Sequence, residues 1–102
     1  MKVIAFVRKL PGLSREEFAQ RWTQEHVRVS TKLGMSPYRI NISVSGLNDE
    51  VPLFDGTAEM YWPSMTALRA ALAGPQGLLA AEDTKQFASE VQLMIVDEHI
   101  VA

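Results

Sequence analysis

The stretch SREEFAQRWTQEHVRVSTKLG (Ser14–Gly34) decides the fold, because it contains both ends and the buried face of one helix. Ser14 and Glu17 have the spacing of a capping box, in which each side chain binds a free backbone amide of the first turn. Gly34 supplies a left-handed stop. The apolar residues that recur at helical spacing are Phe18, Trp22, Val29 and Leu33. His26 falls at the edge of this stripe, so the pattern predicts an inward-facing imidazole.

Shorter elements surround this helix, and their order indicates the fold class. The expected elements are strands at 2–9, 38–45, 57–62 and 90–101, helices at 65–73 and 75–81, and a polar loop at 46–56. The order strand, helix, strand, strand, helix, strand is the split β-α-β pattern of a ferredoxin-like α+β domain. We therefore expect one domain over residues 1–102, a four-stranded antiparallel sheet with its helices on one face.

The first and last strands suggest that the second face of the sheet is also covered. Residues 3–7 are apolar on both faces and residues 91–96 are nearly so, which is typical of strands buried on both sides. Two helices cover only one face, so we expect a second copy of the sheet to cover the other, giving a homodimer. The alternative is that the loop at 46–56 folds back over the sheet.

Composition narrows the class of protein. The chain has 102 residues, 47% of them hydrophobic and 22% charged, which fits one globular domain with a modest core. A net charge of −2 gives no electrostatic reason to expect nucleic acid or an anionic membrane as partner. Cysteine is absent, so thiolate chemistry and disulfides are excluded. No apolar segment is long enough to span a bilayer, and we expect a cytoplasmic protein.

The chain as a whole resembles the EthD family, within the dimeric α/β-barrel superfamily. The residues that carry the resemblance are Pro11-Gly12-Leu13-Ser14, Phe18, Trp22 and His26, then Phe54-Asp55-Gly56, Ala58-Glu59, Trp62 and Gly74-Pro75, and finally Phe87 and Asp97-Glu98-His99. Val27 departs from the pattern, since a small residue before a proline is usual there, and it lets the helix continue. The resemblance implies a homodimer whose sheets pack face to face as a dimeric α/β barrel, with a small pocket between sheet and helices in each subunit.

His26 is the first candidate for catalysis. Burial in an apolar pocket favours the neutral imidazole, which can accept a proton from a phenol or from a carbon next to a carbonyl. Glu59 is the candidate polar partner that would orient this ring. The structural alternatives are that His26 caps a carbonyl or a carboxylate, and that Glu59 pairs with Arg8 or Arg39. Glu25 fits a solvated surface role, and His99 a pairing with a neighbouring acid.

A ligand pocket completes the hypothesis. The side chains expected to line it are Trp22, Phe6, Tyr38, Asn41, Tyr61 and Phe87. The expected ligand is a small hydrophobic molecule, cyclic or aromatic, with a carbonyl or phenol group. Isomerases, cyclases and cofactor-free oxygenases of the superfamily share proton removal from such compounds. The family resemblance implies one of these three reaction types and does not separate them. Two distant histidines give no metal site, and no cofactor is expected. The alternatives are a non-enzymatic ligand-binding or accessory dimer, and a haem-handling protein with His26 as axial ligand.

Overall fold

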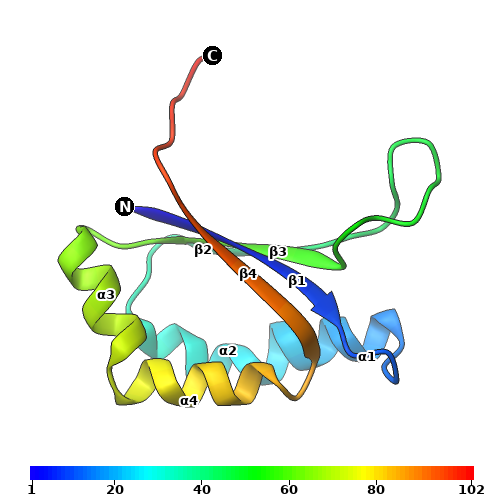
Figure 1. The fold of residues 1–102 in the computed structure, drawn as a ribbon, viewed down its shortest axis with the longest axis horizontal. Helices are drawn as coiled ribbons and strands as arrows, with labels where there is room; N and C mark the ends of the chain where they lie inside the picture. Colours follow the sequence, from blue (N-terminus) through cyan, green and yellow to red (C-terminus); the bar gives the residue numbers. More distant parts are fainter.

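In the computed structural model, which describes residues 1–102, one antiparallel sheet carries its helices on a single face (Figure 1). The strands are β1 (Lys2–Lys9), β2 (Tyr38–Ile42), β3 (Gly56–Tyr61) and β4 (Ala88–Val96). They lie in the order β2-β3-β1-β4, so the first and last strands of the chain are neighbours. The ferredoxin-like α+β fold expected from the sequence is confirmed.

The stretch 14–34 forms one helical rod of four segments. These are α1 (Arg15–Gln20), a π-helix η1 (Arg21–His26), α2 (Val27–Ser30) and a 3₁₀ turn η2 (Thr31–Leu33). The capping box is confirmed, because the Ser14 hydroxyl accepts from the Glu17 amide and the Glu17 carboxylate accepts from the Ser14 amide. Gly34 ends the rod with a positive φ of 82°. The sequence predicted this extent but not the wide turn in the middle, where Trp22 and His26 lie on the buried side.

Two further helices cover the rest of the same face. The first, α3, spans Met65–Ala73 and is capped by the Ser64 hydroxyl, as predicted. The second, α4, begins at Pro75 and ends at Thr84, whereas the sequence predicted an end at Ala81. The extra turn packs against the first helical rod and carries Asp83, which bonds to His26. A tertiary contact, which local propensity does not report, thus accompanies the longer helix.

The strand ends differ from the predicted ones because strands end where their partners end. The second strand was expected to reach Ser45, but it ends at Ile42, which pairs with the first residue of β3, Gly56. The last strand was expected over 90–101, but it spans Ala88–Val96, and Val96 pairs with the start of β1. The third strand begins and ends one residue earlier than expected, at 56–61 rather than 57–62.

The helix-covered face of the sheet holds the core. Val3, Ala5 and Val7 of β1 point toward the helices and are buried. An aromatic cluster packs beneath them, with the Phe18 ring 5.5 Å from Trp22 and 5.9 Å from Phe87 between centroids. Such pairs add favourable ring geometry to the apolar area that they bury. The first helical rod is therefore fixed to the sheet at the level of Trp22 and His26.

The opposite side of the sheet, which we call the open face, has no helix on it (Figure 1). The side chains on it, given by strand register, include Lys2, Ile4, Phe6 and Arg8 of β1, Arg39 and Asn41 of β2, Thr57, Glu59 and Tyr61 of β3, and Gln92 and Met94 of β4. The loop between β2 and β3 rises on this side together with the C-terminal tail (Figure 1). The tip of the loop does not fold back over the sheet, because Leu47 is 96% exposed and Val51 is 91% exposed. Phe54, next to β3, packs against Phe6 on the open face.

Candidate functional site

A cavity of about 470 Å³ lies between the sheet and the helices. Its volume is in the range of small-molecule sites, roughly 300–1,000 Å³. Most of its lining is apolar and comes from the inward side chains of β1, β3 and β4 and from α4. His26, Ser30 and Tyr38 are among the few polar residues in the wall. Apolar walls with a few polar groups are typical of sites that bind an organic molecule and orient it by one end.

The imidazole of His26 is held by one strong contact. Its Nδ1 lies 2.7 Å from Oδ2 of Asp83. An ionised carboxylate accepts hydrogen bonds and donates none, so Nδ1 of the neutral ring carries the proton. The edge of the ring also packs against Phe87, with centroids 5.0 Å apart. The His26 side chain is 8% exposed, so its orientation is fixed by its neighbours.

The other ring nitrogen of His26, Nε2, carries the lone pair. No protein group forms a hydrogen bond with Nε2, and no buried side-chain nitrogen lacks a partner. Nε2 therefore keeps some accessible surface, and His26 lines the cavity. A carboxylate on one nitrogen and accessible surface at the other is an arrangement that suits a general base.

A second polar pair lies in the same wall. The hydroxyl of Ser30 is 2.9 Å from the hydroxyl of Tyr38. Burial raises the pKa of Tyr38, and the neighbouring side chains of Ser30 and Trp22 oppose this effect only in part. The phenol of Tyr38 is therefore present in its protonated form, as a hydrogen-bond donor. The same wall of the cavity thus contains a proton acceptor, the imidazole of His26, and the hydroxyl groups of Ser30 and Tyr38.

The predicted site residues divide between the two faces of the sheet. Those that line the cavity are His26, Trp22, Tyr38 and Phe87. Those that lie on the open face are Glu59, Phe6, Asn41 and Tyr61. The expectation that Glu59 orients His26 is wrong, since the sheet separates the two side chains and Asp83 occupies that role. Within the chain, Glu59 forms no ion pair with Arg8 or Arg39, because its partners are Lys2 and Asn41. Arg39 lies opposite Glu59 in β2, and its charge helps to lower the pKa of Glu59.

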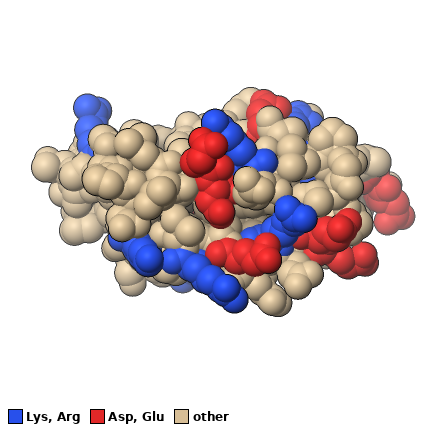
Figure 2. Space-filling view, turned by 90° about the horizontal axis from the view of Figure 1, so that it is seen from below, with Lys and Arg blue, Asp and Glu red and all other residues tan.

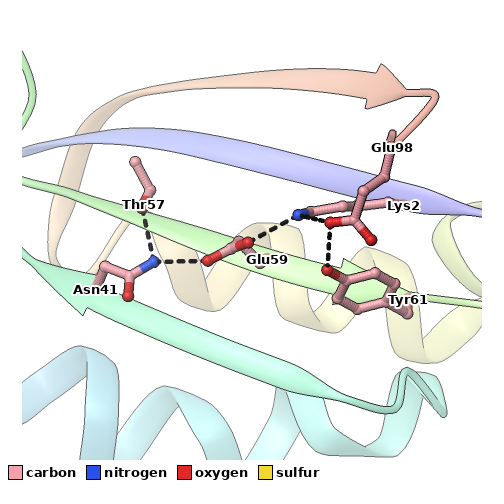
Figure 3. Close-up of polar contacts among 6 residues, drawn as sticks. All are labelled: Lys2, Asn41, Thr57, Glu59, Tyr61 and Glu98. Carbon is pink, nitrogen blue, oxygen red and sulfur yellow. Dashed lines mark hydrogen bonds and ion pairs between the residues drawn. The ribbon is translucent and has the colours of Figure 1, made fainter. Parts of the chain in front are cut away.

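Glu59 belongs to a polar network on the open face (Figure 3). The Lys2 ammonium lies 2.8 Å from Glu59 and 2.6 Å from Glu98. Asn41 donates to Glu59, and the Tyr61 hydroxyl donates to Glu98. Hydrogen bonds, first from Lys2, hold the pKa of both carboxyls below the usual range. Both carboxylates are therefore ionised and already engaged, which leaves them poorly suited to take a proton from a ligand.

The charges elsewhere show no dominant sign. On the helical side of the molecule, basic and acidic side chains lie next to each other (Figure 2). Nowhere do three His, Asp or Glu side chains converge in a way that would hold a metal ion. None of the helices has the length and apolar composition needed to cross a membrane. His99 lies 3.3 Å from Asp97, the pairing with a neighbouring acid that the sequence suggested.

Comparison with known proteins supports the resemblance. The EthD domain matches residues 10–90, which is most of the chain. The chain belongs to the EthD family. Among curated proteins, none is similar to it in sequence.

Solved structures show the same fold as this EthD chain. An EthD family protein from Bacillus halodurans superposes with a TM-score of 0.81 at 24% identity, over 96% of this chain and 97% of that one. A protein from Arabidopsis thaliana gives a TM-score of 0.71 at 16% identity, over 99% and 97%. A dimeric ferredoxin-like protein from Thermobifida fusca gives 0.64 at 13% identity, over 91% and 85%. At these identities the likeness shows the fold, and function remains to be argued from the site.

Sequence reasoning missed two residues of the candidate site in this EthD chain. Asp83 is far from His26 in the chain, and the predicted end of the helix at Ala81 left it outside the helix. A longer helix over 75–84 would have brought an acidic residue into consideration. Ser30 carried a clearer signal, because it follows His26 by four residues and so lies on the same helical face.

Proposed function

We propose that this EthD protein is a small cofactor-independent enzyme that removes a proton from a hydrophobic carbonyl compound or phenol, with His26 as general base. The observation that carries the proposal is the 2.7 Å contact between His26 Nδ1 and Asp83 in the wall of an apolar cavity. The contact fixes the tautomer in which Nε2 is the base. The apolar walls suit a cyclic or aromatic ligand, whose hydrocarbon part would be removed from water.

Asp83 gives the base its strength as the reaction proceeds. When Nε2 takes the proton, the ring becomes positively charged next to the Asp83 carboxylate, and the attraction stabilises that state. Because the ring is buried and packed against Phe87, little reorganisation is needed at that moment. The same imidazolium can return the proton to another carbon. Isomerisation, cyclisation and oxygenation all begin with this removal.

The same proposal includes a homodimer formed through the open face. Ile4, Phe6 and Met94 place apolar side chains there among the polar network. The loop and the tail, which rise on that side, carry exposed apolar residues such as Leu47 and Val101. Similar ferredoxin-like proteins from Thermobifida fusca and Bacteroides fragilis are described as dimeric. Two copies related by a two-fold axis would bury these side chains against each other.

The catalytic part is tested by hydrogen exchange, which needs no knowledge of the final product. We expect the protein to accelerate exchange of the α-hydrogens of 2-tetralone, a bicyclic aromatic ketone, in D₂O, measured by NMR. His26→Gln should lower the rate by about 10²–10⁴-fold, the usual contribution of a general base. His99→Gln changes the other histidine, in the exposed tail, and should leave the rate unchanged. Glu59→Gln should also leave it unchanged, because Glu59 lies on the other face of the sheet.

Equal exchange in the wild type and in His26→Gln would contradict the base assignment. Binding of the ketone without any exchange would favour the non-enzymatic ligand-binding alternative. A Soret band after addition of haemin, lost in His26→Gln, would favour the haem-handling alternative.

The dimer is tested by sedimentation of the purified protein. We expect a dimer at micromolar concentration for the wild type. We expect a monomer for Phe6→Glu, because the substitution would bury a carboxylate in an apolar part of the interface. Leu78→Glu introduces the same charge on α4, at a residue already 65% exposed on the helical side, and should remain dimeric. A monomeric wild type would refute the dimer without touching the catalytic proposal.

A further inference from the structure

We propose that Tyr38, held in place by Ser30, donates a hydrogen bond to the ligand oxygen on which negative charge collects when His26 removes the proton. This inference rests on the proposed function and deepens it, because it states what the ligand must present. The ligand carries an oxygen, carbonyl or phenolic, at the end of an apolar body, and that oxygen binds beside the hydrogen that is removed.

The positions of the three side chains support this arrangement. Ser30 lies one helical turn after His26, and residues four apart on a helix have Cβ atoms roughly 5–6 Å apart. Tyr38 is the first residue of β2 and points to the helix-covered face, as its partner Met60 does. Its hydroxyl reaches the Ser30 hydroxyl at 2.9 Å. All three residues line the same cavity, so one bound molecule can contact the base and the phenol together.

The proton on Tyr38 is available to a ligand in one of the two arrangements of the Ser30–Tyr38 pair. Only one of two paired hydroxyls donates to the other, and Ser30, which is 2% exposed, has no other hydrogen-bond partner for its side chain. When Ser30 donates to the Tyr38 oxygen, the Tyr38 proton is free to point into the cavity. Burial keeps the pKa of Tyr38 above its usual value, so the phenol is present as a donor. A neutral donor in an apolar wall is worth more toward an anionic oxygen than toward a neutral one.

The step is balanced without a further reactant. His26 Nε2 takes the hydrogen from the carbon as a proton, and the pair of electrons of that bond forms a carbon–carbon double bond. The π electrons of the carbonyl move to its oxygen, which becomes the enolate oxygen that Tyr38 stabilises. Return of the proton from His26 to a carbon regenerates a carbonyl. With a phenol, the proton leaves the oxygen itself, and Tyr38 binds the resulting phenolate.

The test uses 4-nitrophenol, whose absorption distinguishes the bound phenol from the bound phenolate. We titrate the complex with pH for the wild type, Tyr38→Phe and Ser30→Ala. We expect Tyr38→Phe to raise the apparent pKa of the bound nitrophenol by about one unit, a tenfold loss of preference for the anion. Ser30→Ala should cause a smaller shift in the same direction. Tyr61→Phe makes the matched change on the open face and should cause no shift.

The rate of 2-tetralone exchange gives a second readout. Loss of one donor to a developing oxyanion costs about 10²-fold in rate, so Tyr38→Phe should lower the rate constant much more than the affinity. Wild-type unfolding midpoints for the variants would exclude a general loss of structure. Nitrophenol that does not bind, or that titrates identically in the wild type and in Tyr38→Phe, would overturn the inference.

The two proposals fail in different ways. If the wild type exchanges 2-tetralone through His26 and Tyr38→Phe is neutral in both assays, His26 stands as the base and Tyr38 has no role. If no exchange occurs but Tyr38→Phe shifts the nitrophenol titration, Tyr38 binds the ligand oxygen and the catalytic proposal fails.

Discussion

The two faces of the sheet carry polar groups of opposite character. On the helix-covered face, the imidazole of His26 and the hydroxyl of Tyr38 each have one hydrogen-bond partner in the protein. Both residues also line the cavity. On the open face, Lys2 is bonded to two carboxylates, and each of these has a second partner. The first group is incomplete without a ligand, whereas the second is already satisfied.

This difference indicates which polar groups of a small domain are candidates for function. Polar groups in an apolar wall are costly unless they are bonded, so a group that is bonded on only one side is a candidate for function. A carboxylate that a lysine and an amide already bind is ionised and needs no ligand. By this criterion the helix-covered face holds the candidate site, and the open face holds a structural network at a proposed interface.

The largest expected effect concerns packing on the helix-covered face. Phe18→Ala should lower the free energy of unfolding by about 4 kcal/mol, because it leaves a cavity in a fully buried aromatic cluster. Phe54→Ala, the same change against Phe6 and Arg8 of the open face, should cost less than half as much, because Phe54 is only partly buried. Urea denaturation measures both. The difference is expected at protein concentrations low enough for the chain to be monomeric, because the second copy of the proposed dimer would cover Phe54. Equal costs in the monomer would contradict it.

The next effect concerns the orientation of His26. Asp83→Asn should lower the rate of 2-tetralone exchange by about 10²-fold, or about 2.7 kcal/mol, because an amide no longer fixes the tautomer or stabilises the imidazolium. Glu82→Gln neutralises the adjacent carboxylate on α4, which pairs only with exposed Lys85, and should have no effect. The exchange assay with purified variants decides this. An unchanged rate in Asp83→Asn would remove Asp83 from the proposed mechanism.

The smallest effect concerns the acid stability of the open-face network. The pKa values of Glu59 and Glu98 are lowered in the folded chain, chiefly by Lys2, so their contribution to stability is complete above the ordinary value of 4.5 and is lost as the pH falls below it. Lys2→Met returns these pKa values toward 4.5. We therefore expect the variant to be less stable near neutral pH and to lose less stability on acidification.

Unfolding midpoints measured from neutral pH down to about pH 3 would reveal this shallower acid limb. Lys32→Met removes a lysine from the exposed 3₁₀ turn and should keep the wild-type slope. Parallel acid limbs in the wild type and in Lys2→Met would show that the network contributes nothing to stability.

Much of the fold could be predicted because its signals are local. The capping box at Ser14 and Glu17 and the stop at Gly34 depend on residues within one helix. Strand ends were less accurate, since the ladder of β2 stops at Ile42 for lack of a partner in β3. No residue of β2 itself carries that information. The shift of the rod into a π-helix over 21–26 likewise has no signal in apolar spacing.

The site was only half predictable. The contact of His26 with Asp83 joins two helices that are distant in the chain, and no local pattern reports it. Glu59 is a different case, because Ala58 and Met60 alternate with it as small and apolar residues. Strand alternation alone places those two toward the core and Glu59 on the other side. Phe6 gave no such signal, since β1 is apolar on both faces.

The unpaired edge of β4 has a consequence for the solubility of the purified protein. β4 is an edge strand with Leu93 and Ile95 about half exposed on one side and Met94 on the other. A long apolar edge recruits strands from other chains without selectivity. During refolding, some chains are therefore expected to form the proposed dimer and others to aggregate. A lysine in place of Ile95 should raise the soluble yield, since a charged side chain on an edge strand blocks such additions.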